Sequence, residues 1–193
     1  MFNLEGLSQD NSVRVVTSRQ LKQQSLDVQR DVYDSHRHRV FALAFYMTGS
    51  EIEAEEILTS TFVKAFRMEP KPSGGQVDSA LVEELRERLP LDRHEPAAEV
   101  HLNGGAKSGL GTRNVRRTDL EEAIQTLPPN ERLLFLLRDV EGYSPAAIAE
   151  LLQMPEAKVQ RGLISARIRL RRALAAGFVV EIPVVREAEQ NAA

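Results

Sequence analysis

The chain has 193 residues, of which 42% are hydrophobic, and its formal net charge is −3 at pH 7. This length allows one or two small domains with ordinary cores, and no apolar run approaches a membrane span. Residues 1–10 lack the basic-then-apolar order of a secretory signal, so we expect a cytoplasmic protein without membrane insertion. There is no cysteine, and four scattered histidines lack metal-ligand spacing, so no metal site or cofactor is expected.

Apolar residues recur every three or four positions almost throughout, which predicts an all-α protein. We expect two small helical domains joined by a flexible linker. After a polar N-terminal extension over 1–26, the first firm helix is predicted over 27–47, and Gly49 can end it. Its buried stripe is predicted to consist of Val40, Leu43, Ala44 and Met47.

A second helix follows at once. Ser50 and Glu53 have capping-box spacing at its start, and the helix is predicted to run to Arg67. Residues 27–67 thereby form one N-terminal helical module. The face predicted to pack on the first helix comprises Ala54, Ile57, Leu58, Thr61, Phe62, Ala65 and Phe66.

The composition changes over 68–117, where proline and glycine break the helical pattern. A short helix is predicted over 78–89, and a linker rich in glycine, proline and charge follows it. This segment is therefore the predicted boundary between the two domains.

Residues 118–174 are predicted to form a four-helix domain, and 175–193 a mostly disordered tail. Thr118 and Glu121 have capping-box spacing at the start of the domain, and a second helix is expected over 130–140. The residues predicted to be buried in these two helices are Leu120, Ala123, Ile124, Leu127, Leu133, Leu136, Leu137 and Val140.

The last two predicted helices have the pattern of a helix-turn-helix. Ser144 is a good N-cap before Pro145, the first helix is short and ends near Leu152, and Pro155 can open the second. An ordinary helical hairpin uses the same spacing. The charge favours DNA binding, because residues 157–172 contain six cationic side chains and no acidic one. A solvated basic helix without a ligand is the alternative.

Two segments resemble a known family. The sequence LEEAIQTLPPNERLLFLLRDVEGYSPAAIAELLQMPEAKVQRGLISARIRLRRAL, over 120–174, is similar to region 4 of bacterial sigma-70 factors, which reads the −35 promoter element. The sequence HRHRVFALAFYMTGSEIEAEEILTSTFVKAFR, over 36–67, resembles the start of region 2 in the short extracytoplasmic-function group. The order of the two modules is that of this group.

The resemblance implies that the helix from Pro155 enters the major groove, where Arg161 can read guanine and Gln160 adenine. It also implies partners: core RNA polymerase, promoter DNA and an anti-sigma factor. The predicted DNA-binding residues are Ser144, Glu156, Lys158, Gln160, Arg161, Arg167, Arg169 and Arg171. The predicted polymerase-binding residues are Glu55, Glu56, Thr59, Ser60 and Val63, for which an ordinary solvated helix face is the alternative.

The chain also departs from the family pattern. Glu56 and Thr59 stand where members usually have an Asp-x-x-Gln pattern, so the amide is lost. Gly162 stands where an arginine is common in the recognition helix, which implies the loss of a phosphate contact. Residues 68–134 contain no aromatic side chain, although capturing unstacked bases usually relies on aromatic platforms.

These patterns leave three functions open, none of them enzymatic. The leading prediction is a sigma factor that directs polymerase to promoters. The first alternative is a sigma-like regulator that binds polymerase or DNA without melting promoters, as the missing aromatic segment suggests. The second is a response-regulator type of DNA-binding protein, which requires an N-terminal domain of alternating strands and helices. His36 and His38 have no catalytic constellation nearby and are interpreted, with Arg37 and Arg39, as a solvated basic face.

Overall fold

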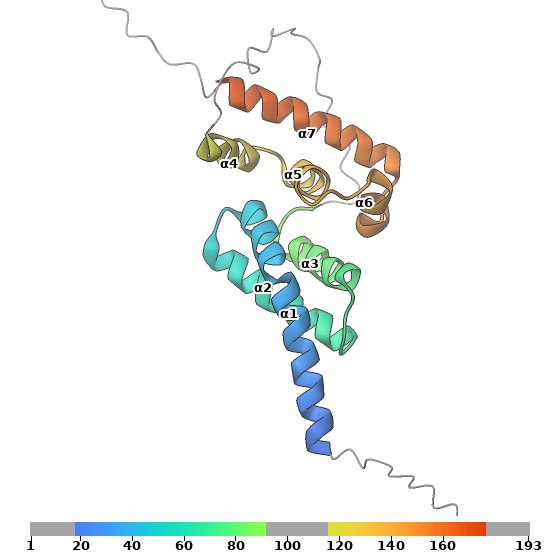
Figure 1. The fold of residues 1–193 in the computed structure, drawn as a ribbon. Helices are drawn as coiled ribbons and strands as arrows, with labels where there is room; N and C mark the ends of the chain where they lie inside the picture. Colours follow the sequence, from blue (N-terminus) through green and yellow to red (C-terminus); the bar gives the residue numbers. More distant parts are fainter. Residues whose placement is uncertain (1–17, 92–115, 177–193) are drawn as a thin grey trace, which may run out of the picture.

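The computed structural model describes residues 18–91 and 116–176, and within these stretches the chain forms helices and no strand (Figure 1). The predicted all-α class is therefore confirmed. None of the described helices combines the length and the apolarity that a bilayer crossing requires. The first part of the predicted extension, the linker over 92–115 and the tail from 177 lie outside the described residues.

The first helix, α1 (Ser18–Thr48), begins earlier than predicted and ends where expected. Gly49 follows it with a φ of +75°, a left-handed conformation that glycine adopts without strain. All four residues of the predicted stripe, from Val40 to Met47, are at most 2% exposed. The N-terminal turns of α1 project beyond the other helices (Figure 1), and the side chains over 23–27 are exposed.

The second helix, α2 (Glu51–Met68), packs against α1 with the predicted apolar face. Ser50 caps it, because its Oγ accepts the Glu53 N–H at 3.4 Å. The reciprocal half of a capping box is replaced by a hydrogen bond of 3.3 Å from the Ser50 N–H to the Thr48 hydroxyl.

The third helix, α3 (Gly74–Arg88), begins four residues before the predicted Asp78. Ser73 and Gln76 form a capping box there, so Gly74 and Gly75 lie in the first turn instead of ending the helical structure. Val77, Leu81 and Leu85 are buried, and α3 packs on both α1 and α2. The described N-terminal part is thus a three-helix module, which argues against the strand-containing receiver of a response regulator.

The C-terminal domain contains α4 (Arg117–Gln125), α5 (Pro129–Phe135), a π-helical turn η2 (Leu136–Val140), α6 (Pro145–Leu152) and α7 (Glu156–Ala176). Figure 1 shows α7 lying across α4, α5 and α6 on the side remote from the N-terminal module. The module and the domain touch through the contacts of α1 with α4 and α5 and of α3 with α6.

Three local predictions in this domain are wrong. The helix α4 starts before Thr118, because the Asp119 carboxylate accepts the Arg116 backbone N–H at 3.1 Å. Leu120 is 37% exposed, and Arg117 and Thr118 in the same turn of α4 are also exposed. Val140 is 55% exposed because it lies in the π-helical turn, which shifts the register of the side chains away from the α-helical period.

Candidate nucleic-acid and protein interfaces

The turn between α6 and α7 has the geometry of a helix-turn-helix. The Ser144 hydroxyl accepts the Ala147 N–H at 3.1 Å, and Pro145 occupies the first helical position. Gln153 adopts the left-handed conformation with a φ of +53°, and the Met154 N–H bonds to the Ala149 carbonyl at 3.0 Å. The predicted caps and the tight connection are therefore both present.

One face of α7 is packed into the domain. Val159, Leu163 and Ala166 are at most 5% exposed, and α7 contacts α5, α6 and α4. Ser165, also on this face, donates from its hydroxyl to Glu131 of α5 at 2.8 Å. These contacts fix the rotation of α7 about its axis and so decide which cationic side chains reach solvent.

Gly162 belongs to this packed face, and its interpretation as a lost DNA contact is wrong. A Cβ placed on Gly162 would lie 2.4 Å from Cδ1 of Leu134, which is itself 4% exposed. A side chain at position 162 therefore points toward α5, not toward a groove of DNA. The glycine permits close approach of the two helices.

The opposite face of α7 is exposed and mixed in character. Gln160, Arg161 and Arg171 are exposed, and Lys158 is half-buried. Gln160 donates to the Glu156 carboxylate at 3.0 Å, which orients both side chains along the first turns. Ile164, 58% exposed, lies on the same face and was not among the residues predicted from the sequence.

Two of the predicted DNA-binding arginines are engaged within the domain. Arg167 forms a bidentate contact with Asp139, with its Nη2 2.7 Å from Oδ1, although its side chain is still 52% exposed. Arg169 lies 3.0 Å from the carboxylate of Glu131, which is only 5% exposed. Without Arg169, the buried carboxylate of Glu131 would lack a cationic partner, so Arg169 has a structural role in the domain.

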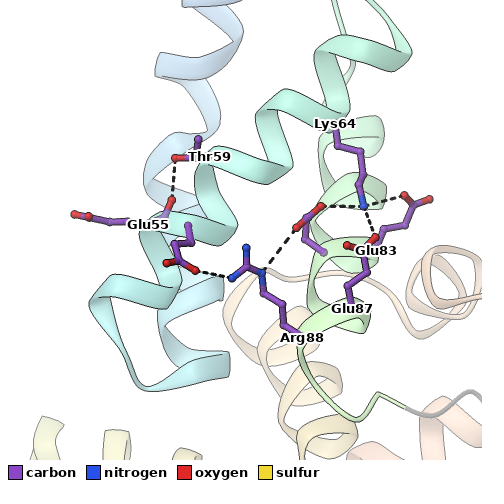
Figure 2. Close-up of polar contacts among 8 residues, drawn as sticks. Glu55, Thr59, Lys64, Glu83, Glu87 and Arg88 are labelled. Atoms are coloured by element: carbon purple, nitrogen blue, oxygen red, sulfur yellow. Dashed lines mark hydrogen bonds and ion pairs between the residues drawn. The ribbon is translucent and has the colours of Figure 1, made fainter.

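The outer face of α2 carries the residues predicted to bind polymerase. Glu55, Glu56 and Thr59 are exposed, Ser60 is half-buried, and Val63 is 45% exposed. Figure 2 shows the Thr59 hydroxyl turned back along the helix, where it donates to the Glu55 carbonyl at 2.9 Å. Ile52, 74% exposed at the start of α2, is another large apolar side chain on this helix that the sequence interpretation missed.

A network of charges joins this face to α3 (Figure 2). Lys64 lies 2.9 Å from Glu84 and 2.8 Å from Glu87, and Arg88 lies 2.8 Å from Glu56. Burial lowers the pKa of Lys64, but its hydrogen bonds to Glu87 and Glu84 outweigh burial and hold that pKa above its ordinary value. Glu56 is thus paired with Arg88, whereas Glu55 stands at the outer edge of the network.

Comparisons with known proteins agree with this geometry. Residues 117–176 match the family described as "Sigma-70, region 4", which covers the helix-turn-helix and the helices that support it. The chain is also 25% identical over 162 residues to the ECF RNA polymerase sigma factor SigE of Mycolicibacterium smegmatis. Residues 117–176 therefore form a sigma-70 region 4 domain, and the chain as a whole is similar to extracytoplasmic-function sigma factors. That alignment covers 72% of this chain and 59% of the relative, so the chain spans less than two thirds of the relative's length.

A solved structure shares the fold of this chain. It is the sigma factor RpoE from Bartonella quintana, crystallised in complex with the anti-sigma factor NepR. The TM-score is 0.51 at 16% sequence identity, and the alignment covers 81% of this chain and 98% of that one. At this identity the likeness concerns the fold.

Residues 127–132, with the sequence LPPNER in the matched region 4, have a structural role. Arg132 is buried and donates to the carbonyls of Leu127 at 3.0 Å and of Met47 at 2.7 Å. Burial lowers the pKa of Arg132. Glu131, its neighbour, holds Ser165 of α7. The two polar residues of the motif thus join α5 to three other parts of the fold, and neither is displayed toward a ligand.

Proposed function

We propose that this chain is a transcription initiation factor that binds core RNA polymerase and recognises the −35 element of promoter DNA. The observation that carries the proposal is the exposed face of α7, which presents polar and cationic side chains beside a helix-turn-helix within the matched region 4. In this fold the second helix enters the major groove and the first crosses the backbone. The chain would act by binding, without catalysis.

The proposed base-reading residues lie on the first turns of α7. Gln160 and Arg161 are exposed there, and each has the hydrogen-bonding groups that suit adenine and guanine edges respectively. Glu156 holds Gln160 in place at 3.0 Å, and Lys158 lies beside them. Arg167 and Arg171, farther along the exposed face, are proposed to contact phosphates.

Two other predicted residues take indirect parts in the proposal. Ser144 caps α6 with its hydroxyl, and the amino end of that helix offers partial positive charge to a phosphate. Arg169 is committed to Glu131 at 3.0 Å and supports the position of α7. Its removal would therefore weaken DNA binding chiefly by loosening the domain.

The proposed polymerase-binding surface is the outer face of α2. It combines the carboxylates of Glu55 and Glu56 with Thr59, Ser60 and the exposed Val63, a mixture that suits a protein partner with cationic side chains around an apolar contact. Because Arg88 already pairs with Glu56, the more available charge is that of Glu55. We also propose an anti-sigma partner and a cytoplasmic location, where polymerase and promoters are found.

A second candidate is a regulator that binds polymerase or promoter DNA without strand opening. The observation that favours it is the absence of aromatic residues from 68 to 134. Within the described part of that segment, α3 presents charged side chains such as Glu83 and Glu87 to solvent, which are poor platforms for unstacked bases.

Transcription with purified components separates the two candidates. The full chain is mixed with core polymerase, co-elution is measured by gel filtration, and transcripts are sequenced from a promoter library. Co-elution with promoter-specific transcripts supports initiation. Co-elution without transcripts refutes initiation and supports the regulator. Failure to co-elute refutes initiation and leaves only a regulator that binds promoter DNA, which a gel-shift assay with the same promoter library then tests.

A matched pair of variants tests the DNA face. Arg161→Gln removes a proposed base contact on α7, whereas Arg30→Gln removes an exposed charge on α1, whose side chain is 82% exposed. We expect Arg161→Gln to weaken binding to the selected promoter by about 1–3 kcal/mol and to relax its sequence preference, with Arg30→Gln unchanged. Equal losses in both variants would contradict the assignment of this face.

A further inference from the structure

Ile164 is an exposed apolar side chain on α7 that has no part in the contacts proposed so far. It is 58% exposed, and no other large apolar residue among those described in α6 and α7 is as open to solvent. Its neighbours in sequence, Leu163 and Ser165, are both buried. Single exposed apolar residues are common on protein surfaces, so the meaning of this one depends on the side chains around it.

Ile164 belongs to a row of exposed residues along α7. The row consists of Ala157, Gln160, Arg161 and Ile164, which occupy positions i, i+3, i+4 and i+7 of the helix. Residues at these intervals share one face of an α-helix. The recognition helix of a homeodomain, which is a variant of the helix-turn-helix, reads base edges with residues at the same intervals. The row therefore brings Ile164 to the same groove as Gln160 and Arg161.

The packing of α7 fixes the direction in which this row points. Leu163 and Ala166 are buried, and the Ser165 hydroxyl donates to the buried Glu131 at 2.8 Å, so α7 cannot turn about its axis without breaking these contacts. Isoleucine is branched at Cβ, and in a helix it has one strongly preferred χ1 rotamer. The side chain of Ile164 is thus already ordered, and an apolar contact made by it costs little further conformational entropy.

The side chains beside Ile164 indicate what kind of group it contacts. Gln160, Arg161 and Arg167 surround it with polar and cationic groups, whereas the centre of a protein interface is depleted of charge. In the major groove of DNA, the apolar group that a base edge presents is the C5-methyl of thymine. Three residues advance about 4.5 Å along a helix, and base pairs stack about 3.4 Å apart, so Ile164 reaches one or two base pairs beyond the pair that Arg161 faces.

We propose that Ile164 is a specificity residue that reads a thymine of the promoter element by packing against its C5-methyl group. The thymine lies one or two base pairs from the pair contacted by Arg161. This inference rests on the proposed function, because it requires α7 to lie in the major groove of promoter DNA. Ile164 forms no hydrogen bond with the base, so it distinguishes thymine from a pyrimidine that lacks the methyl group by apolar contact alone.

Deoxyuridine tests this contact, because it pairs with adenine as thymidine does and lacks only the C5-methyl group. The full chain is assembled with core polymerase, and a −35 element is selected from the promoter library. Each thymine of that element, on either strand, is then replaced by deoxyuridine, and equilibrium binding of the assembly to each duplex is measured by fluorescence anisotropy. Ile164→Ala is compared with Val140→Ala, which shortens an exposed apolar side chain of η2 outside the row.

We expect one replacement to weaken binding of the wild type about 3–5-fold, which is the loss expected when one methyl group leaves an apolar contact. The Ile164→Ala assembly should bind the thymine and deoxyuridine duplexes equally well, and both more weakly than the wild type binds the thymine duplex. Val140→Ala should keep the wild-type ratio of the two affinities. A purely structural role of Ile164 would weaken both affinities and leave their ratio unchanged, so the ratio separates the two roles.

Several results would overturn the inference, and they are distinguishable from failure of the proposed function. If no deoxyuridine replacement weakens binding of the wild type, or if the methyl effect persists in Ile164→Ala, the contact is refuted while promoter recognition stands. Loss of polymerase binding in Ile164→Ala, with the ratio unchanged, would assign Ile164 to a protein contact. A sensitive thymine more than two base pairs from the pair whose preference relaxes in Arg161→Gln would contradict the register. If the assembly selects no −35 element, the proposed function fails and the inference fails with it.

Discussion

The contact between Gly162 and Leu134 gives a quantitative prediction, because two opposing effects meet at one position. Replacing Gly162 by alanine in the middle of α7 raises helix propensity by about 1 kcal/mol. The new Cβ would lie 2.4 Å from the Leu134 Cδ1, whereas carbon atoms pack at about 3.5–4.0 Å. Leu134 is 4% exposed, so its methyl group must move by about 1 Å within a packed core.

Overpacking of this kind costs about 1–3 kcal/mol, so Gly162→Ala should destabilise the protein by about 1 kcal/mol after the gain in propensity. Leu134→Ala alone should cost about 2–5 kcal/mol. In the Leu134→Ala background the methyl group is gone, and Gly162→Ala should then stabilise by up to about 1 kcal/mol. The coupling energy between the two positions is therefore expected to be about 2 kcal/mol.

Urea unfolding of the full chain, followed by circular dichroism, measures all four proteins of this cycle. Gly75→Ala is the matched control, because a Cβ at that position meets no atom within 4 Å. A gain of about 1 kcal/mol for Gly162→Ala in the wild-type background, with no coupling to Leu134, would refute the close contact. Gly162→Arg separates the two interpretations of this position. The packing against Leu134 predicts that this variant does not fold, whereas the family pattern predicts an added phosphate contact and tighter DNA binding.

Three further predictions concern buried polar groups. Arg169→Ala should lower the free energy of unfolding by about 3 kcal/mol, because the buried carboxylate of Glu131 loses its cationic partner. Arg171→Ala should leave the melting temperature unchanged and only lower the salt dependence of DNA binding. Equal melting temperatures for the two variants would contradict the structural role of Arg169. Arg132→Lys keeps the positive charge but loses the several N–H donors of the guanidinium that bind the Met47 and Leu127 carbonyls, so the urea midpoint of unfolding should fall. An unchanged midpoint would show that these hydrogen bonds do not stabilise the fold. Burial and then the bond to Asp78 raise the pKa of Tyr143 above its ordinary 10.0, so the contribution of its hydroxyl to folding stability is complete below pH 10 and is lost as the pH rises through the raised value. Absorbance titration should show a late phenol ionisation that is missing in Tyr143→Phe, and its persistence there would refute the assignment.

Much of the helical layout follows from local patterns. The end of α1 at Gly49, the cap at Ser50 and the limits of α6 depend on residues within one turn of each other, and all were predicted. The errors arose where local signals competed. Gly74 and Gly75 were interpreted as breakers, yet the capping box of Ser73 and Gln76 starts α3 there. Val140 followed the right period until a π-helical turn displaced it.

For the candidate surfaces, too, local patterns predicted which residues are exposed but not which charges are paired. The exposed positions of Glu55, Thr59 and Val63 follow from the periodicity of α2, and those of Arg161 and Arg171 from that of α7. The pairing of Glu56 with Arg88 does not, because it depends on how α3 packs against α2. Periodicity shows which face of a helix is polar, but it does not show which charge on that face already has a partner.

The sequence by itself determined the all-α class, the helix-turn-helix at Ser144 and the two faces of α2, since caps and periodicity act within a few residues. Only the tertiary structure decided that Gly162 faces Leu134, that Arg169 serves Glu131, and that Asp78 is buried between Arg39 and Tyr143. The two residues of each contact lie 28 to 65 residues apart and in different elements of the fold. Their meeting depends on the rotation and register of packed helices, which the whole core sets and no local pattern encodes.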